Sequence, residues 1–261
     1  MYLEQFDLSG KVALVTGGTG LLGSEFCRGL AEAGADIVVI SRDAEKQAAL
    51  GAEIRQLGRA FDGFACDLTD LEGIGRVADA AWELHGHVDI VVHNAMSHAT
   101  TRGLGITDMT MDAMDYQLAV STKSACVIFQ RLCPKMAAGD GGSVITVTSR
   151  AGMEPVTGLL AYGLGKGSLI LLTKHVAKEF GPKVRANVFC PGIIDTDGSR
   201  TNAPLGQTNI PQISAGRLGR SEECVGLIIY LASSASSYTN GQVIMVDGGH
   251  FGSAGVKRGP S

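Results

Sequence analysis

The sequence predicts an α/β fold in which a doubly wound parallel sheet of about seven strands carries helices on both faces. Short apolar runs alternate with segments of ten or more residues that have helical periodicity, which is typical of parallel βαβ units. A glycine-rich turn separates the first apolar run from the first helical segment. The length of 261 residues suits one α/β domain. Because parallel strands end at one edge of such a sheet, we expect ligand-binding residues directly after strands.

Apolar runs bounded by turn residues predict the strands of the first half, and apolar residues spaced three and four apart predict its helices. In chain order we expect a strand at Lys11–Thr16, a helix ending near Ala33, a strand at Asp36–Ser41, a helix at Ala44–Leu57, a strand at Ala60–Cys66, a helix at Leu71–His85 and a strand at Val88–His93.

The same patterns continue in the second half. In chain order we expect a long helix at Met109–Met136, a strand at Ser143–Thr148, a helix at Ala161–Phe180, a strand at Val184–Cys190, a helix at Ser221–Ser233 and a strand at Gln242–Val246. The polar segment 195–216 is expected to form a lid over a substrate, and 253–261 a polar tail. Since we find no linker or repeat, we expect one domain over residues 1–261.

Composition excludes several classes of function. The net charge is −4 and the sequence shows no basic stripe, which argues against a nucleic-acid partner. The six cysteines form no Cys-x-x-Cys pair and several lie in apolar runs, which predicts unpaired buried thiols. No group of side chains has metal-ligand spacing, so no catalytic metal is predicted. Without an 18-residue apolar run or a signal-like N-terminus, no membrane partner is predicted and a cytoplasmic location is expected.

The turn Thr16–Gly23 contains the pattern Gly18-x-Gly20-x-x-Gly23 between a predicted strand and a predicted helix. Glycines let the backbone approach a pyrophosphate, and the helix N-terminus supplies N–H donors and a positive dipole. A purely structural turn is the alternative, but its position favours a Rossmann-type dinucleotide site. The residues predicted to contact the coenzyme here are Gly17, Thr19, Gly20, Leu21 and Leu22.

The end of the second strand distinguishes NADP(H) from NAD(H). An acidic residue at this point binds a ribose hydroxyl, whereas a basic residue suits a 2′-phosphate. Ser41 and Arg42 offer a hydroxyl and a guanidinium, which favours NADP(H). Asp43 opposes this interpretation, Arg42 could be a solvated residue of the next helix, and NAD(H) is the less favoured alternative. Asp67, followed by Leu68, could accept from the adenine amino group or cap the next helix.

Tyr162 and Lys166 are four residues apart, so they share one face of a helix. An ammonium beside a phenol favours the phenolate and lowers the phenol pKa, which suits proton transfer to or from a carbonyl oxygen. This spacing alone is a weak signal, because many surface helices carry it by chance.

The chain resembles the short-chain dehydrogenase/reductase family in its short single-domain branch. The resemblance runs from Lys11 to His250, and Ser149 precedes Tyr162 by the thirteen residues that this family shows. The residues that carry it are Thr16–Gly23, Asp67-Leu68, Asn94-Ala95, Ser149, Tyr162, Lys166, Asn187, Pro191-Gly192, Thr196 and the run Val246-Asp247-Gly248-Gly249.

The resemblance implies a role for each matching residue. Tyr162 is the general acid/base, Lys166 lowers its pKa and binds the nicotinamide ribose, and Ser149 hydrogen-bonds the substrate oxygen. The residues implied to hold the nicotinamide half of the coenzyme are Asn94, Ala95, Pro191, Gly192, Ile194 and Thr196. Hydride then moves between the nicotinamide and a carbonyl carbon.

The chain departs from the family in four places, one of which is the set of glycines at 163, 165 and 167 around the predicted catalytic helix residues. Leu21 stands where the turn usually has its middle glycine, and Met96 stands where a glycine usually follows Asn94-Ala95. Ser121 stands where the family often has a relay asparagine. We therefore include Ser121 among the predicted catalytic residues, as a holder of a relay water.

The residues predicted to contact substrate are Met96, His98, Ser149, Met153 and Ile193. The alternatives are that His98 is solvated and that the apolar residues are ordinary core. Apolar side chains around the site favour a hydrophobic carbonyl compound or alcohol.

The leading hypothesis is an NADP(H)-dependent oxidoreductase that interconverts a ketone or aldehyde and an alcohol. The alternatives are a non-catalytic dinucleotide-sensing or scaffold protein, an NAD-preferring dehydrogenase, or a dehydratase or epimerase using the same site. The helices predicted at 109–136 and 161–180 carry more apolar surface than one side of a sheet requires. In the family such helices pair across subunits, so a homotetramer or homodimer is expected.

Overall fold

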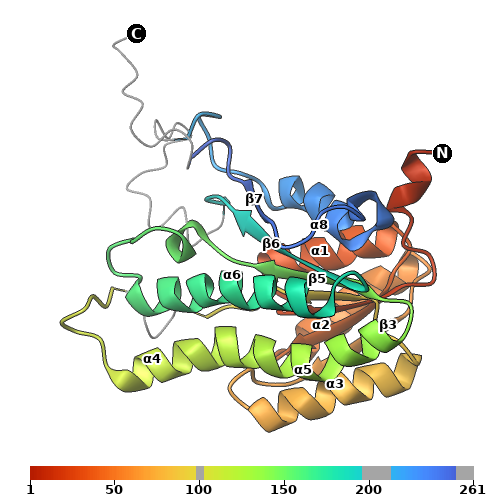
Figure 1. The fold of residues 1–261 in the computed structure, drawn as a ribbon, viewed down its shortest axis with the longest axis horizontal. Coiled ribbons are helices and arrows are strands. Elements are labelled where there is room, and N and C mark those ends of the chain that lie inside the picture. Colours follow the sequence, from red (N-terminus) through yellow and green to blue (C-terminus); the bar gives the residue numbers. More distant parts are fainter. Residues whose placement is uncertain (98–102, 196–212, 251–261) are drawn as a thin grey trace.

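Seven strands form one parallel sheet in the computed structural model, which describes residues 1–97, 103–195 and 213–250 (Figure 1). The strands are β1 (Val12–Thr16), β2 (Asp36–Ser41), β3 (Phe61–Ala65), β4 (Ile90–His93), β5 (Gly142–Val147), β6 (Val184–Pro191) and β7 (Val243–Val246). Their spatial order is β3-β2-β1-β4-β5-β6-β7, and every pairing is parallel. The order reverses between β1 and β4, which is where a sheet of this kind binds ligands.

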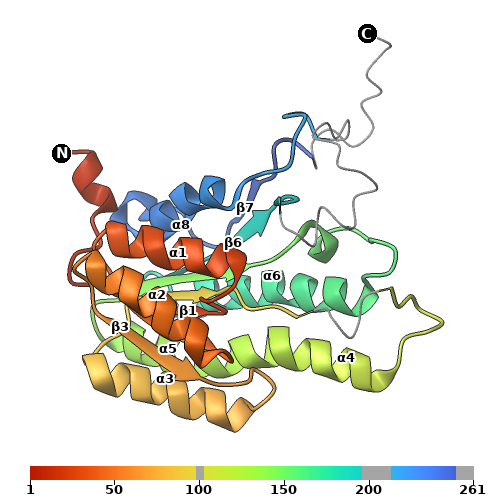
Figure 2. The same ribbon diagram turned by 180° about the vertical axis from the view of Figure 1, so that it is seen from behind.

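Helices cover both faces of the sheet, as Figures 1 and 2 show from opposite sides. The helices of one face are α1 (Leu21–Glu32), α2 (Ala44–Gln56) and α8 (Val225–Ala232), and those of the other are α3 (Leu71–His85), α5 (Ser124–Ala138) and α6 (Leu160–Phe180). Successive strand residues point to opposite faces: Leu14 and Val38 belong to one core cluster, Val15 and Val39 to the other. The predicted doubly wound fold is confirmed.

The segment predicted as one helix at Met109–Met136 contains an irregular turn. It comprises α4 (Met111–Leu118), a π-helical turn η2 (Ala119–Lys123) and then α5. Within the turn, the Ser121 hydroxyl donates to the Gln117 carbonyl at 2.6 Å. Such hydroxyl-to-carbonyl bonds compete with the helical pattern, and single π turns occur frequently at functional sites. The predicted segment at Ser221–Ser233 also begins differently, with a short 3₁₀ turn η4 (Ser221–Cys224) before α8.

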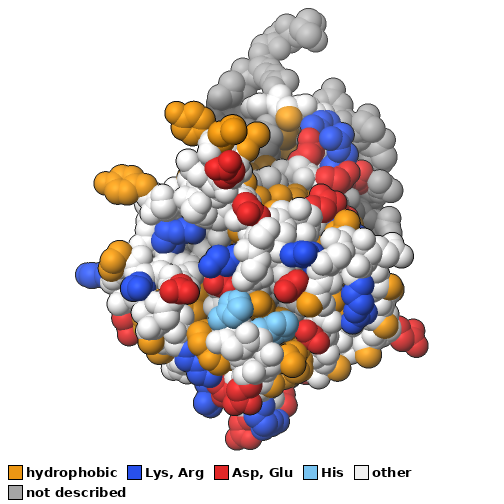
Figure 3. Space-filling view, turned by 90° about the vertical axis from the view of Figure 1, so that its right-hand side faces the viewer, with side chains coloured by type: hydrophobic (Ala, Val, Ile, Leu, Met, Phe, Trp, Pro, Cys, Tyr) orange, Lys and Arg blue, Asp and Glu red, His pale blue; other side chains and the backbone are white. Residues whose placement is uncertain are grey.

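Three further 3₁₀ turns are η1 (Leu3–Phe6), η3 (Arg150–Gly152) and η5 (Ser234–Ser236). Positive and negative side chains are interspersed on the face in Figure 3. None of the helices in the described ranges has the length and apolar character needed to cross a membrane. The predicted tail at 253–261 and most of the predicted lid at 195–216 lie outside the described residues.

Candidate active site

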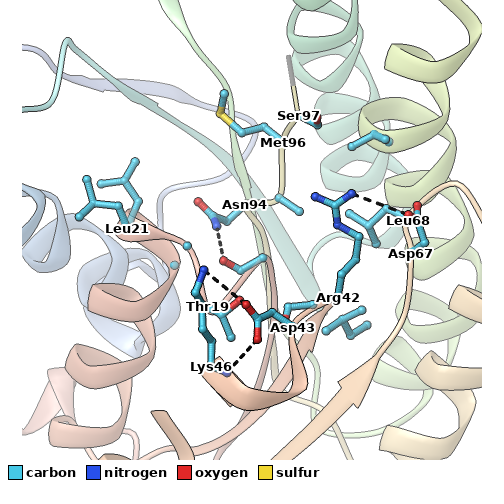
Figure 4. Close-up of a pocket in the computed structure, with 18 of the residues that line it drawn as sticks. Thr19, Leu21, Arg42, Asp43, Lys46, Asp67, Leu68, Asn94, Met96 and Ser97 are labelled. Atoms are coloured by element: carbon cyan, nitrogen blue, oxygen red, sulfur yellow. Dashed lines mark hydrogen bonds and ion pairs between the residues drawn. The ribbon is translucent and has the colours of Figure 1, made fainter. Parts of the chain in front are cut away.

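A cavity of about 720 Å³ lies at the carboxyl ends of β1 to β4 (Figure 4). Most of the residues predicted to contact a coenzyme line it: Gly17, Thr19, Gly20, Leu21, Leu22, Ser41, Arg42, Asp67, Leu68, Asn94, Ala95 and Ile194. Gly23 and Asp43, for which the sequence predicts no contact, also line it. The remaining lining residues that were not predicted to contact a ligand are Ile40, Lys46, Cys66, Ser97, Tyr116 and Val120. Predicted Thr196 and His98 lie outside the described residues.

The glycine turn has the tight backbone that a pyrophosphate requires. Gly17 has φ +65°, and a Cβ there would lie 2.8 Å from the Ala95 Cα. A Cβ at Gly23 would lie 2.1 Å from the Gly17 carbonyl oxygen. Gly20 is the N-cap of α1, and Leu21, in place of the usual glycine, is the first residue of that helix and half exposed. The turn therefore tolerates a side chain at Leu21 while keeping the backbone cradle, which fits the phosphates of a dinucleotide.

Asn94 joins the end of β4 to the glycine turn. Its side-chain amide donates to the carbonyls of Thr16 at 3.2 Å and Gly17 at 3.3 Å. The backbone N–H groups of Asn94 and Ala95 both donate to the Thr16 hydroxyl at 3.1 Å. These hydrogen bonds hold the segment after β4 against the glycine turn after β1, and both segments line the cavity.

Two cations enter the cavity from the segment after β2, as Figure 4 shows for Arg42 and Lys46. Asp43, which opposed the NADP(H) interpretation, caps α2 by accepting from the Lys46 backbone N–H at 3.0 Å. That hydrogen bond holds the pKa of Asp43 below its ordinary value. The other Asp43 oxygen lies 3.4 Å from the Lys46 ammonium. Lys46 was not predicted from the sequence, where its place in the first turn of the helix after the second strand was the one available signal.

Asp67 faces Arg42 in the lining of the cavity, with the nearest charged atoms 3.9 Å apart. Its carboxylate also accepts from the backbone N–H and the hydroxyl of Thr69, both at 2.8 Å. The alternative that Asp67 caps the next helix is wrong, because Asp70 caps α3 by accepting from the Gly73 N–H at 2.8 Å.

Ser149, Tyr162 and Lys166 come together where β5 ends and α6 begins. Ser149 precedes η3 and its hydroxyl accepts from the Ala151 N–H at 3.3 Å. A side-chain hydrogen bond links Ser149 and Tyr162. The Lys166 ammonium lies 6.0 Å from the centre of the Tyr162 ring and donates to the Val147 carbonyl at 2.7 Å.

Burial dominates the titration of both helix residues. It lowers the pKa of Lys166 from 10.5 to about 8, because the protein interior penalises the charged amine. It raises the pKa of Tyr162, and the hydrogen bond with Ser149 opposes that rise only in part. The sequence predicts that Lys166 lowers the pKa of Tyr162. The pKa of Tyr162 is instead raised, because the loss of solvation on burial outweighs the other effects.

Glycines in α6 allow close packing around this set. A Cβ at Gly163 would lie 2.6 Å from the Ala151 carbonyl, and one at Gly165 would lie 2.4 Å from the Ser121 hydroxyl. Ser121 is fully buried against α6, with its hydroxyl committed to Gln117. Among the described residues it lies outside the cavity lining, so its assignment as a catalytic residue stays a prediction.

A second cavity of about 190 Å³ opens beside Ser149. Four predicted site residues line it: Ser149, Pro191, Gly192 and Ile193. Arg150 and His250 add polar groups, with the Arg150 guanidinium 2.8 Å from the His250 imidazole and 2.9 Å from the Glu154 carboxylate. Predicted Met153 directly follows η3 and lies outside both cavities as the described residues define them. Within the described ranges, no three His, Cys, Asp or Glu side chains are grouped to hold a metal ion.

Comparisons with known proteins agree over almost the whole chain. The family model described as enoyl-(acyl carrier protein) reductase matches residues 20–250. Human dehydrogenase/reductase SDR family member 4 is 34% identical over 247 residues, 93% of this chain and 88% of that protein. The 2-dehydro-3-deoxy-D-gluconate 5-dehydrogenase of Pseudoalteromonas atlantica is 31% identical over 255 residues, 96% of this chain and 99% of that protein. A solved gluconate 5-dehydrogenase from Burkholderia cenocepacia, in complex with NADP and tartrate, has a TM-score of 0.89 at 30% identity and covers 97% of this chain and 99% of its own.

Proposed function

The chain belongs to the short-chain dehydrogenase/reductase family, and on that premise we propose that it is an NADP(H)-dependent oxidoreductase interconverting a ketone or aldehyde and an alcohol. The observation that carries the proposal is the Ser149, Tyr162 and Lys166 set beside a cavity with a glycine cradle. The coenzyme would supply or accept the hydride when bound.

Proton transfer falls to Tyr162 in this proposal. Its hydroxyl carries the proton at neutral pH and would donate it to the carbonyl oxygen, or accept it back from the alcohol. Ser149, hydrogen-bonded to Tyr162, would share the substrate oxygen and fix its position. The buried Lys166 ammonium, held by Val147, would stabilise negative charge as it develops on the Tyr162 oxygen.

Replacing Tyr162 with Phe tests this assignment, since the ring stays and the proton is lost. We expect coenzyme affinity near the wild-type value and turnover lower by roughly a hundredfold or more. The substrate panel should contain simple ketones, polyhydroxy acids because of the gluconate dehydrogenase relatives, and a 2-enoyl thioester because of the matching family description. Near-normal turnover by Tyr162→Phe would overturn the proposal.

The preference for NADP(H) rests on charge at the end of β2. Thr19, Ser41, Arg42 and Lys46 line the same cavity and provide two hydroxyls and two cations for a 2′-phosphate. A related structure was solved in complex with NADP. The Asp43 carboxylate opposes the preference, but its hydrogen bond to the Lys46 backbone commits it to capping α2.

Single alanine variants at Arg42 and Lys46 test the coenzyme preference. Each should weaken NADPH binding by roughly tenfold or more, the size of a charge-assisted hydrogen bond, and leave NADH binding unchanged. Arg131→Ala, which removes a cation on α5 paired with Asp79, is the matched control. Unchanged preference for NADPH in both variants would contradict the role of these two cations, and tighter binding of NADH than of NADPH by the wild type would favour NAD(H) instead.

We also propose assembly as a homotetramer or homodimer. Leu164 and Leu171 on α6 are 50% and 62% exposed, and burying such side chains favours association. Light scattering of the purified protein tests the assembly, and a monomer at micromolar concentration would contradict it. The substrate lid at 195–216 and the cytoplasmic location stay predictions.

A further inference from the structure

The side chain of Met96 lies against the hydroxyl of Tyr162. The Met96 sulfur is 3.8 Å from the Tyr162 Oη, and Met96 lines the large cavity directly after Asn94 and Ala95 (Figure 4). Met96 is 45% exposed, whereas Tyr162 is 8% exposed. The Met96 thioether therefore covers the cavity side of the Tyr162 hydroxyl. That hydroxyl is the group that transfers the proton in the proposed reaction.

We infer that Met96 is a specificity-determining gate: its side chain must be displaced before a carbonyl oxygen reaches Tyr162, so it limits the size of the substituent on its side. This inference rests on the proposed function, because it concerns access to the same hydroxyl. It assigns a role to a side chain at the point where the family usually has a glycine.

The packing shows which partner moves. The backbone before Met96 is fixed, since the N–H groups of Asn94 and Ala95 donate to the Thr16 hydroxyl. Tyr162 is fixed by α6, where Gly163 packs closely on Ala151. The methionine side chain has three rotatable bonds, and its sulfur is a weak hydrogen-bond acceptor. A carbonyl oxygen is a stronger acceptor, so a substrate that fits can replace the thioether at the Tyr162 hydroxyl.

The two cavities that border the site leave different room for a substrate. Met96 lies against the Tyr162 hydroxyl and lines the 720 Å³ cavity, which the coenzyme would fill in the proposed function. The 190 Å³ cavity beside Ser149 does not have Met96 in its described lining and is bounded by Val156, Leu159 and Met245. A carbonyl compound with one small and one large substituent matches this asymmetry: the small group faces Met96 and the large group enters the cavity beside Ser149. The inferred substrate class is therefore a carbonyl compound of that shape.

Two ketones and three variants test the gate. Acetophenone has a methyl and a phenyl substituent, whereas benzophenone has two phenyls. In Met96→Ala, the ratio of kcat/KM for benzophenone to that for acetophenone should rise by roughly tenfold or more, the scale of discrimination by pocket size. Met96→Leu keeps the bulk without the sulfur and should keep the wild-type ratio. Met111→Ala, an exposed methionine on α4, is the matched control and should also keep it.

A measurement without turnover separates the gate from the function. N-acetylimidazole acetylates accessible tyrosine hydroxyls, and peptide mass spectrometry reports the rate at Tyr162 against fully exposed Tyr238. Met96→Ala should accelerate acetylation of Tyr162 by roughly tenfold relative to Tyr238, whereas Met96→Leu should not. An unchanged rate in Met96→Ala overturns the gate, even if the wild type reduces acetophenone. If the rate rises but no variant reduces either ketone or any other panel compound, the gate stands and the proposed function falls.

Discussion

Replacing Lys166 with Met should change how stability depends on pH. Lys166 is 1% exposed, and burial lowers its pKa from 10.5 to about 8. Below about pH 8 the folded protein holds a buried ammonium, and the difference in pKa between the unfolded and folded states corresponds to roughly 3 kcal/mol of lost stability. Between about pH 8 and 10.5 the unfolded chain binds more protons than the folded one, so stability rises with pH and the penalty disappears.

Methionine keeps the length of the side chain and removes the charge, so Lys166→Met has no such penalty. The loss of the hydrogen bond to the Val147 carbonyl adds a cost. That cost depends little on pH. The informative quantity is therefore the difference in free energy of unfolding between the wild type and Lys166→Met, and how that difference changes with pH. Relative to Lys166→Met, the wild type should gain on the order of 2 kcal/mol in free energy of unfolding between pH 7 and pH 10.

Urea unfolding followed by circular dichroism at both pH values measures this difference at one fixed protein concentration. Lys174→Met, at an exposed position of the same helix, is the control and should show no such change. Other titrating groups cancel, because they are shared by the proteins compared. If the wild type and Lys166→Met differed by the same free energy of unfolding at pH 7 and at pH 10, the assignment of a buried amine that titrates near pH 8 would be refuted.

Three further predictions concern packing and access. Gly23→Ala should weaken coenzyme binding by roughly tenfold or more, since its Cβ would lie 2.1 Å from the Gly17 oxygen, and unchanged affinity would contradict the cradle. Gly165→Ala should lower the free energy of unfolding by about 1–3 kcal/mol. Adding Ser121→Ala should recover part of that loss, because the Ser121 hydroxyl is the nearest obstacle, and strictly additive effects would argue against the contact. Bound coenzyme should slow alkylation of Cys66, which lines the cavity, and not that of Cys126.

Much of the fold could be predicted because its signals are local. Apolar runs such as 36–41 are strands in the structure, and α3 spans the predicted residues Leu71–His85. The π-helical turn at Ala119–Lys123 could not be predicted, because it accompanies a buried contact between Ser121 and α6. The same contact explains a glycine at 165 that helix propensity alone disfavours.

The candidate site was predictable to the extent that it follows strand ends. Residues of the glycine turn and of the ends of β2, β3 and β4 line one cavity, as parallel connectivity requires. The sequence did not predict that Lys46 lines this cavity. A lysine in the first turn of a helix has the same sequence pattern whether it faces a cavity or the solvent. The role of Asp43 was also open until its hydrogen bond to the Lys46 backbone showed that it is a helix cap.

The sequence by itself determined the order of strands and helices and the residue types at each strand end, because periodicity and turn chemistry act over a few residues. It therefore identified the family and brought Ser149, Tyr162 and Lys166 together as a predicted set. Only the tertiary structure decided the directions in which the pKa values of Tyr162 and Lys166 shift, and the contact of Met96 with Tyr162. Those properties depend on desolvation and on distances between segments far apart in the chain, which no local pattern encodes.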